Sequence, residues 1–347
     1  MTNPPNKEKK KMGRGLKITL IVVGALLALC LIAGIVLFCM SRAGKEDLTK
    51  LPETDDPVPY NEIVTYNGHH YVYNTNMTAF ALIGVDKRQL GVTNADANAI
   101  GMADVTVLFA VDQKSGKATL VTLPRDTVCE VDIYRNGSLH RTTRSQLCTA
   151  FSYGDGGALS CENTLRSMRR VLYGIPIQKY VCLDMDGIAP LGDALGGVTL
   201  TAQIDLPQYG IRTGDTVTLK GDMTEAYLRA RGKEELDAAY ERAERQQQYF
   251  AALGDSLRDT LKNDPASLPA LYGTLTEYTL TDITLENVTA LAGLMMGQGV
   301  TEFDSVTLAG SYTAEPIEDS DDVYALFTPD PDKLYQTVID VFYLPLD

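Results

Sequence analysis

The chain has 347 residues, enough for one large or two ordinary domains, and its formal net charge is −14. The first 17 residues carry six Lys or Arg against one acid, so the rest of the chain carries −19. Such an acidic remainder argues against the broad basic face that binds nucleic-acid phosphates, and we expect no nucleic-acid partner.

The N-terminal region has the pattern of a membrane anchor. The basic segment 1–17 precedes 23 uncharged, mostly apolar residues at 18–40, which is long enough to cross the hydrocarbon core. A cleaved signal peptide is the alternative, but its apolar core is normally shorter. We expect a single-pass anchor in a bacterial cell membrane, with the basic tail in the cytoplasm and the C-terminal domain outside. Residues 41–60 are polar, contain three prolines, and are predicted to form a stalk.

Three short runs rich in β-branched residues follow, at 80–85, 105–111 and 118–123. Each has the length of a strand buried on both faces and is bounded by turn residues. Before them, an Asn67-Gly68 pair between two short apolar runs predicts a hairpin with a type I′ turn. These runs predict the centre of a β-sheet.

Charged residues flank each of the three runs. Asp86 and Arg88 follow the first, Asp104 opens the second, and Arg125 and Asp126 follow the third. In a sheet that is buried on both faces, charged side chains must lie at strand ends, where loops converge and ligands bind. We therefore expect these acids and arginines to share one rim, where Asp126 either binds a ligand or orients Arg125.

The remaining pattern alternates helices and strands, which predicts an α/β fold: a mixed central β-sheet between helices. We expect helices at 145–153 and 159–172 and a strand–helix–strand crossover at 180–202. A long helix at 235–262 would place Arg242, Arg245 and Gln246 on one face. The domain is assigned to 61–264, and 265–347 is an α/β extension that either completes its sheet or forms a small appended lobe.

Four cysteines, Cys129, Cys148, Cys161 and Cys182, fall in the region expected outside the cell, where disulfides persist. Four cysteines allow three pairings, and the pattern does not choose among them. Because Cys129 follows the Pro-Arg-Asp segment and Cys161 lies near the start of a helix beside the expected rim, we hypothesise a disulfide between these two. No Cys/His spacing suits zinc.

Seven ordered segments give the chain a recognisable pattern. The first three are Phe80-x-Leu-Ile-Gly-Val-Asp-x-Arg88, Ala103-Asp104-Val-Thr-Val-Leu and Val121-Thr-Leu-Pro-Arg-Asp126, and four more lie at 175–180, 193–198, 227–231 and 242–246. Together they cover about half of the chain. The pattern resembles the LytR-CpsA-Psr family of bacterial cell-envelope proteins.

The resemblance implies a membrane-anchored phosphotransferase. Members of this family transfer an anionic glycopolymer, such as a teichoic acid or a capsular polysaccharide, from a polyprenyl-diphosphate carrier to a muramic acid hydroxyl of peptidoglycan. On this resemblance Asp104 and Arg125 are the expected catalytic residues, and Asp86 and Asp104 the expected ligands of Mg²⁺. The expected diphosphate-binding residues are Arg88, Arg125, Arg229, Arg231, Arg242, Arg245 and Gln246.

Three positions depart from the family pattern. Met102 stands where the family often has Arg, and Gln146 and Cys148 stand where Lys and Asn are common. Two other functions remain open: a regulatory or polyprenyl-phosphate-binding protein without catalysis, and hydrolysis of the diphosphate. The glycine-rich loop at 153–157 is either a turn between two helices or a phosphate-binding loop, although it lacks the Lys-Ser/Thr of a nucleotide-binding loop.

Overall fold

The structure, a computed structural model, describes residues 40–50, 63–85, 100–230, 237–297, 302–316 and 323–346. Its main element is a six-stranded mixed sheet with the strand order β11-β8-β3-β4-β5-β12. These strands are β3 (Met77–Val85), β4 (Ala103–Asp112), β5 (Lys117–Leu123), β8 (Lys179–Asp184), β11 (Thr279–Thr281) and β12 (Glu302–Thr307). The three predicted central strands are confirmed as β3, β4 and β5, which are adjacent and antiparallel.

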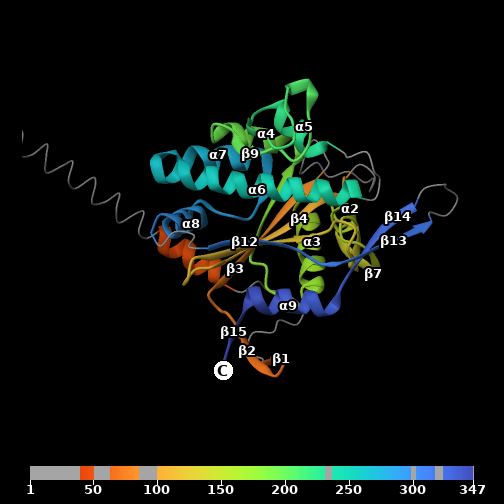
Figure 1. Cartoon of the computed structure of the whole chain (residues 1–347). Helices are drawn as coiled ribbons and strands as arrows, with labels where there is room; N and C mark the ends of the chain where they lie inside the picture. The colour runs from red at the N-terminus through yellow and green to blue at the C-terminus, as the bar shows by residue number, and fades with distance from the viewer. Residues whose placement is uncertain are drawn as a thin grey trace, which may run out of the picture.

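Helices cover both faces of this sheet, as Figure 1 shows. One face packs against α2 (Thr149–Ser152), α3 (Ala158–Val171) and α9 (Pro331–Phe342) in the largest apolar core. The other face packs against α6 (Asp237–Asn263), α8 (Leu285–Gly297) and the helical residues 40–49. The predicted fold class, a mixed sheet between helices, is therefore confirmed. Burial on both faces explains why the central strands read as continuous apolar runs.

A smaller lobe extends beyond α6. It contains α4 (Met185–Ala194), β9 (Val198–Thr201), the 3₁₀ turn η2 (Pro207–Tyr209), β10 (Thr216–Leu219) and α5 (Asp222–Arg229). The predicted crossover at 180–202 is wrong, because β9 pairs only with β10 in a separate sheet. Alternate residues of β9 are buried, which is the pattern of a strand with one covered face rather than of a buried parallel strand.

Three hairpins project from the sheet. They are β1 (Val64–Tyr66) with β2 (His69–Tyr73), β6 (Val128–Arg135) with β7 (Ser138–Gln146), and β13 (Gly310–Pro316) with β14 (Val323–Pro329). Asn67 and Gly68 have φ of 50° and 82°, so the predicted type I′ turn is confirmed. The predicted helix at 145–153 is wrong in its first half, because β7 pairs with β6 up to Gln146. Most of β7 is exposed and none of it is buried, so its sequence lacks the apolar alternation that marks a strand.

The C-terminal region beyond residue 264 supplies both edge strands of the main sheet, β11 and β12. It also contains the 3₁₀ turn η3 (Pro265–Ser267), α7 (Leu268–Tyr278) and β15 (Tyr343–Pro345), which pairs with β2.

Part of the segment predicted as a stalk is folded onto the domain. Within the helical residues 40–49, Leu48 is buried, and the Asn287 side chain donates to the Gly44 carbonyl at 3.3 Å. A Cβ at Gly44 would lie 2.0 Å from the Glu286 carbonyl oxygen, so glycine permits this approach. Within the described residues no helix combines the length and apolar character of a membrane span. Residues 18–39 of the predicted anchor lie outside the described residues.

Candidate functional site

The antiparallel register of β4 and β5 brings Asp104 and Arg125 together. Thr106 pairs with Leu123, so the start of β4 and the end of β5 lie at the same edge of the sheet. There the Arg125 Nη1 donates to the Asp104 Oδ1 in an ion pair. The two side chains remain partly exposed, at 26% for Arg125 and 18% for Asp104. Two of the five residues predicted to share one rim are thus in direct contact.

Two sulfur atoms complete the surroundings of the guanidinium. Arg125 Nη2 lies 3.5 Å from the Cys148 Sγ and 3.6 Å from the Met102 Sδ. Backbone hydrogen bonds join the same three chain segments. The Cys148 amide donates to the Arg125 carbonyl at 2.9 Å, and the Ala103 amide donates to the Cys148 carbonyl at 3.1 Å. Three chain segments are therefore fixed around one arginine.

Asp126 links this group to the C-terminal hairpin. Its Oδ1 lies 3.5 Å from the Arg125 Nε and accepts a hydrogen bond from the Gln146 Nε2 at 2.9 Å. The same Gln146 nitrogen donates to the Ala325 carbonyl of β14, and the Phe327 amide donates to the Asp126 carbonyl. Asp126 thus orients Arg125, one of the two roles that the sequence left open.

Met102, Gln146 and Cys148 are the residues that sequence reasoning did not place in the site. All three are positions at which the chain departs from the family pattern, and all three contact Arg125 or Asp126. Taken together, these three departures from the family pattern were a signal in the sequence that the positions belong to one site.

The electrostatic surroundings keep Arg125 charged and Cys148 neutral. Burial by itself lowers the pKa of the Arg125 guanidinium, but Cys148, Asp104 and Asp126 raise it above its usual value. Burial raises the pKa of the Cys148 thiol to about 11, although the nearby Arg125 opposes this. At neutral pH the group is a cation between two carboxylates and a protonated thiol.

Two other predicted arginines, Arg229 and Arg245, lie on α5 and α6. Arg229 pairs with Glu225 on the same helix at 2.8 Å and is 44% exposed. Arg245 is buried and donates from Nη2 to the Ala230 carbonyl, which follows α5. The remaining predicted site residues lie outside the residues or side chains that the structure describes: Asp86, Arg88, Arg231, Arg242 and Gln246.

The loop at 153–157 has the contacts of a turn between helices. The Gly157 and Ser160 amides both donate to the Asp155 Oδ1, at 2.7 and 3.2 Å, and the Gly156 amide donates to the Ser160 Oγ. The Asp155 carboxylate occupies the start of α3, where a phosphate would otherwise bind. This arrangement favours the turn over the phosphate-binding loop.

The hypothesised Cys129–Cys161 disulfide is wrong, because the four described cysteines are buried and none of them forms a disulfide. Cys129 is a neighbour of Cys148, and burial raises the pKa of the Cys129 thiol to about 12. Cys161 and Cys182 instead both raise the pKa of the half-buried Tyr180 hydroxyl. The spacing along the chain did not show this separation.

No three His, Cys, Asp or Glu side chains of the described ranges lie close enough together to hold a metal ion. Asp104 nevertheless has the chemistry of a magnesium ligand. Its Oδ1 contacts Arg125, and its second carboxylate oxygen is of the type that magnesium binds.

The sequence profile of the LytR_cpsA_psr family matches residues 41–338. Two relatives are named polyisoprenyl-teichoic acid--peptidoglycan teichoic acid transferase TagU. The protein from Halalkalibacterium halodurans is 29% identical over 50% of this chain and 50% of its own length, and that from Enterococcus faecalis is 29% identical over 47% and 50%. Biofilm regulatory protein A of Streptococcus mutans is 27% identical over 43% of this chain and 34% of its own length. The chain thus matches about half the length of the two transferases.

Solved structures share the fold. The crystal structure of TagV from B. subtilis has a TM-score of 0.58 and 19% identity, over 76% of this chain and 96% of that one. A structure described as TagT bound to LI-WTA has a TM-score of 0.56 and 20% identity, over 77% of this chain and 89% of that one. Because the family profile covers most of the residues, the chain belongs to the LytR-CpsA-Psr family.

Proposed function

We propose that this chain is a phosphotransferase that attaches an anionic glycopolymer, carried on polyprenyl diphosphate, to peptidoglycan. Family membership, the names of the transferase relatives and the Arg125–Asp104 pair support this proposal. The Arg125–Asp104 pair is the strongest support, because it combines a hydrogen-bond donor for phosphate with a carboxylate at one partly exposed rim.

Arg125 is suited to bind the diphosphate. A guanidinium donates to phosphate oxygens in a forked geometry, and the bonds that it makes to the sulfur atoms of Cys148 and Met102 are weak enough to be exchanged for them. Asp104 and Asp126 hold the guanidinium from other sides, so its position is fixed before the substrate arrives. Such preorganised charge is the main source of catalysis in phosphoryl transfer.

Asp104 is suited to act as the base. In the proposed step, the acceptor hydroxyl oxygen forms a bond to the phosphorus nearest the sugar, and the bond from that phosphorus to the bridging oxygen breaks. Polyprenyl phosphate leaves with the bridging oxygen, and the hydroxyl proton passes to the Asp104 carboxylate. Arg125 stabilises the negative charge that develops on the phosphoryl oxygens.

Asp104, together with Asp86 outside the described residues, would hold Mg²⁺. A bound magnesium ion would neutralise charge on the diphosphate oxygens. The role of Asp104 as ligand and its role as base are separate proposals about the same carboxylate.

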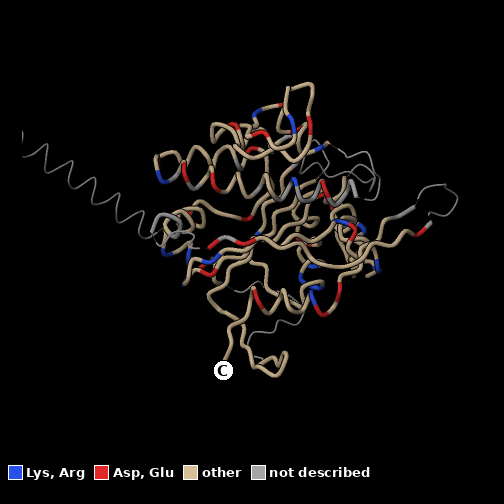
Figure 2. Tube along the Cα trace, in the orientation of Figure 1, with Lys and Arg blue, Asp and Glu red and all other residues tan. Residues whose placement is uncertain are grey.

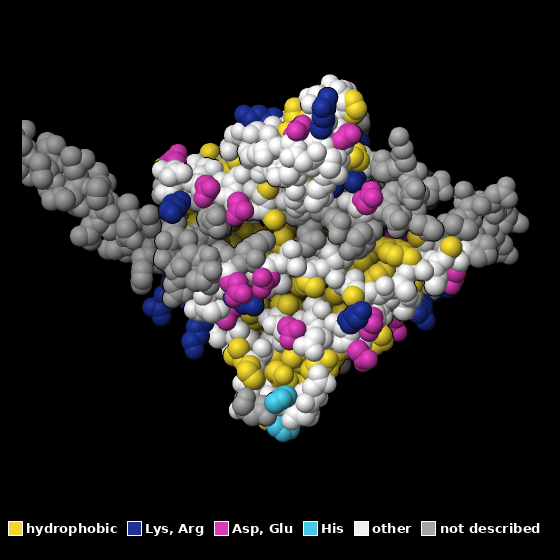
Figure 3. All heavy atoms as spheres, in the orientation of Figure 1, with side chains coloured by type: hydrophobic (Ala, Val, Ile, Leu, Met, Phe, Trp, Pro, Cys, Tyr) yellow, Lys and Arg dark blue, Asp and Glu magenta, His cyan; other side chains and the backbone are white. Residues whose placement is uncertain are grey.

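The polyprenyl chain requires an apolar surface beside this rim. Val105, Val107 and Leu120 of the sheet pack with Ala251 of α6 in a small apolar cluster. In the space-filling view, hydrophobic side chains are visible in the band between the upper lobe and the sheet (Figure 3). We propose that the lipid enters between α6 and the sheet, and that the segment 18–40 anchors the chain in a bacterial membrane with the domain outside.

The test is reconstituted transfer with the full chain, a polyprenyl-diphosphate-linked glycopolymer, peptidoglycan fragments and magnesium. We expect polymer to become attached to the fragments with the wild type and not with Asp104→Asn. Lipid binding without any turnover would favour the regulatory alternative, which the similarity to Biofilm regulatory protein A suggests.

A further inference from the structure

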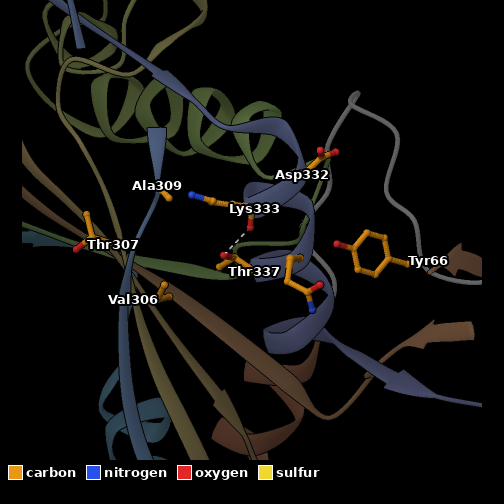
Figure 4. A pocket seen from close by; sticks show the side chains of 8 residues that line it. Tyr66, Val306, Thr307, Ala309, Asp332, Lys333 and Thr337 are labelled. Carbon is orange, nitrogen blue, oxygen red and sulfur yellow. Dashed lines mark hydrogen bonds between the residues drawn. The ribbon is translucent and has the colours of Figure 1, made fainter. Parts of the chain in front are cut away.

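A pocket of about 400 Å³ lies between the edge strand β12, the β1–β2 hairpin and α9, away from the residues that bind Arg125. Figure 4 shows that Tyr66 points its hydroxyl toward α9, while Lys333 extends from α9 toward Ala309. The polar side chains of the pocket are Tyr66, Thr307, Asp332, Lys333, Gln336 and Thr337. They supply donors and acceptors at an open surface rather than in a closed core.

Three tyrosines extend this pocket into an aromatic row, Tyr66–Tyr335–Tyr173. The ring centroids of Tyr66 and Tyr335 are 5.3 Å apart with an interplanar angle of 62°, and those of Tyr335 and Tyr173 are 5.3 Å apart at 83°. Tyr173 at the end of the row is 46% exposed. The edge-to-face contacts fix the rings and leave part of their apolar surface in solvent.

The backbone of Tyr173 is unusual for so large a residue. Its φ is 55°, in the left-handed region, directly after the C-cap residue Leu172 of α3. This position normally favours glycine, and a side chain there costs stability. The Gly174 amide donates to the Arg169 carbonyl at 2.8 Å, so the helix end is already closed by its backbone. Because the helix end does not need this side chain, an exposed aromatic ring at a strained position indicates that the ring takes part in binding.

The charge of α9 limits what can bind. Its N-cap and exposed turns carry Asp330, Asp332 and Asp340, against one basic residue, Lys333. Charged residues of both signs are spread along the described chain, and the acids on α9 are visible in Figure 2. The excess of acids on α9 favours an uncharged ligand there, and sugar rings can place their apolar faces on tyrosines and their hydroxyls on Asp332, Gln336 and Thr337.

β14 connects this surface to the Arg125 site. The Phe327 amide donates to the Asp126 carbonyl, and Asp330, three residues later, caps α9 by accepting from the Asp332 amide at 3.1 Å. The six residues from Phe327 to Asp332 are joined by five steps along the chain and span at most about 18 Å. A chain of sugar rings bound along α9 therefore has the reach to place one hydroxyl at the rim.

We propose that the aromatic row and its adjoining pocket bind the uncharged glycan chain of the acceptor. The assignment of this glycan as acceptor rests on the proposed function, whereas binding of sugar rings can be tested without it.

The experiment titrates the full chain in detergent with a soluble oligomer of β-1,4-linked N-acetylglucosamine and follows binding by calorimetry. We expect Tyr173→Gly to melt at nearly the same temperature as the wild type, because glycine relieves the left-handed strain while the contact with Tyr335 is lost. The same variant should bind the oligomer about five- to tenfold more weakly. Gln336→Ala, which leaves the row intact, should also weaken binding.

The matched control is Tyr209→Ala, which removes a tyrosine that is 38% exposed in η2, and its affinity should equal that of the wild type. Equal affinity of Tyr173→Gly and wild type would overturn the proposal. So would tighter binding of a teichoic acid polymer than of the uncharged oligomer at this surface. Loss of transfer with sugar binding intact would count against the proposed function alone.

Discussion

Arg125 and Cys148 are joined twice, by the side-chain contact from Nη2 to Sγ at 3.5 Å and by the hydrogen bond from the Cys148 amide to the Arg125 carbonyl at 2.9 Å. The backbone bond fixes the position of the arginine, while the thiol is only a weak acceptor. The backbone hydrogen bond therefore holds Arg125 in place, whereas the substrate would replace only the weak contact with the thiol.

Cys148→Ala should therefore leave lipid binding almost unchanged. The backbone bond, Asp104 and Asp126 still hold Arg125, and the lost sulfur contact is weak. We expect a loss of stability of about 1 kcal/mol from the small cavity and a change in polyprenyl-diphosphate affinity below about threefold. The measurements are urea unfolding and lipid titration. An affinity loss as large as that of Arg125→Ala would show that the thiol takes part in binding.

Arg125→Ala should weaken binding of the diphosphate lipid by roughly ten- to a hundredfold, because a charge-assisted contact of about 1.5–3 kcal/mol is lost. It should also destabilise the fold by about 1–3 kcal/mol, since Asp104 and Asp126 lose their common partner. Arg135→Ala, which alters an exposed arginine at the end of β6, is the control and should change neither quantity. Wild-type affinity in Arg125→Ala would remove Arg125 from the site.

Asp104→Asn should behave differently from Arg125→Ala. The amide keeps the shape of the side chain but has no charge and does not accept a proton, so turnover should fall by about a hundredfold or more. Lipid affinity should change much less, because Arg125 remains in place. Parallel measurement of turnover and lipid binding distinguishes the two variants. Equal losses of binding and turnover would contradict separate roles for the two residues.

Much of this site could be predicted, and the limits have physical reasons. Asp104 and Arg125 each stand next to an apolar run, so their position at strand ends followed from the pattern. The contacts of Arg125 with Cys148 and of Asp126 with Gln146 depend on the β6–β7 hairpin, whose second strand is polar and largely exposed and has no apolar alternation to mark it. The burial of Arg245 depends on how α6 packs on α5, which helical periodicity does not determine.

The buried thiols predict how stability depends on alkaline pH. Burial raises the pKa of Cys129 to about 12 and that of Cys148 to about 11, above the value of about 8.5 for an unfolded thiol. The unfolded chain then loses protons that the folded chain keeps, so stability is complete below pH about 8.5 and falls as the pH rises toward 11.

Each thiol should contribute a slope of at most about 1.4 kcal/mol per pH unit in that window. Urea unfolding at several pH values between 7 and 10 measures the slope, and Cys129→Ala should reduce it. A free energy of unfolding that stays constant over this range would contradict burial of the thiols.

Asp132 should be a major contributor to stability. It is fully buried and accepts hydrogen bonds from Arg170 at 2.9 Å and Thr142 at 2.6 Å, with Arg166 at 3.4 Å. Asp132→Asn should cost about 3–5 kcal/mol, because two arginines lose a buried partner. Asp304→Asn, at an exposed pair with Lys117, should cost less than about 1 kcal/mol. Equal costs in urea unfolding would contradict this ranking.

Acid should weaken the same interaction. Burial raises the pKa of Asp132, but its bonds to Arg170 and Thr142 outweigh this and hold the pKa below its usual value. The stabilisation is thus present above pH about 4 and is lost as the pH falls through the folded pKa. The drop in unfolding free energy below pH about 4 should be smaller in Asp132→Asn than in the wild type.

In the fold, too, the sequence predicts the ranges of helices and strands better than it predicts which strands pair. The central strands and α3 match their predicted ranges closely, because buried runs and helical periodicity are local signals. The partner of β9 was wrong, since a short strand does not specify its neighbour. The pairing of β15 with β2 joins residues more than 250 positions apart and has no local signal.

The most direct test of the proposed transfer identifies both products of one reaction. The full chain is incubated with a polyprenyl-diphosphate-linked glycopolymer, magnesium and peptidoglycan fragments, and the products are analysed by mass spectrometry. The account predicts equal amounts of polyprenyl phosphate and of fragments carrying the polymer through a phosphodiester, and neither product with Asp104→Asn. Polyprenyl phosphate together with free polymer phosphate, and no modified fragment, would show hydrolysis and contradict the account.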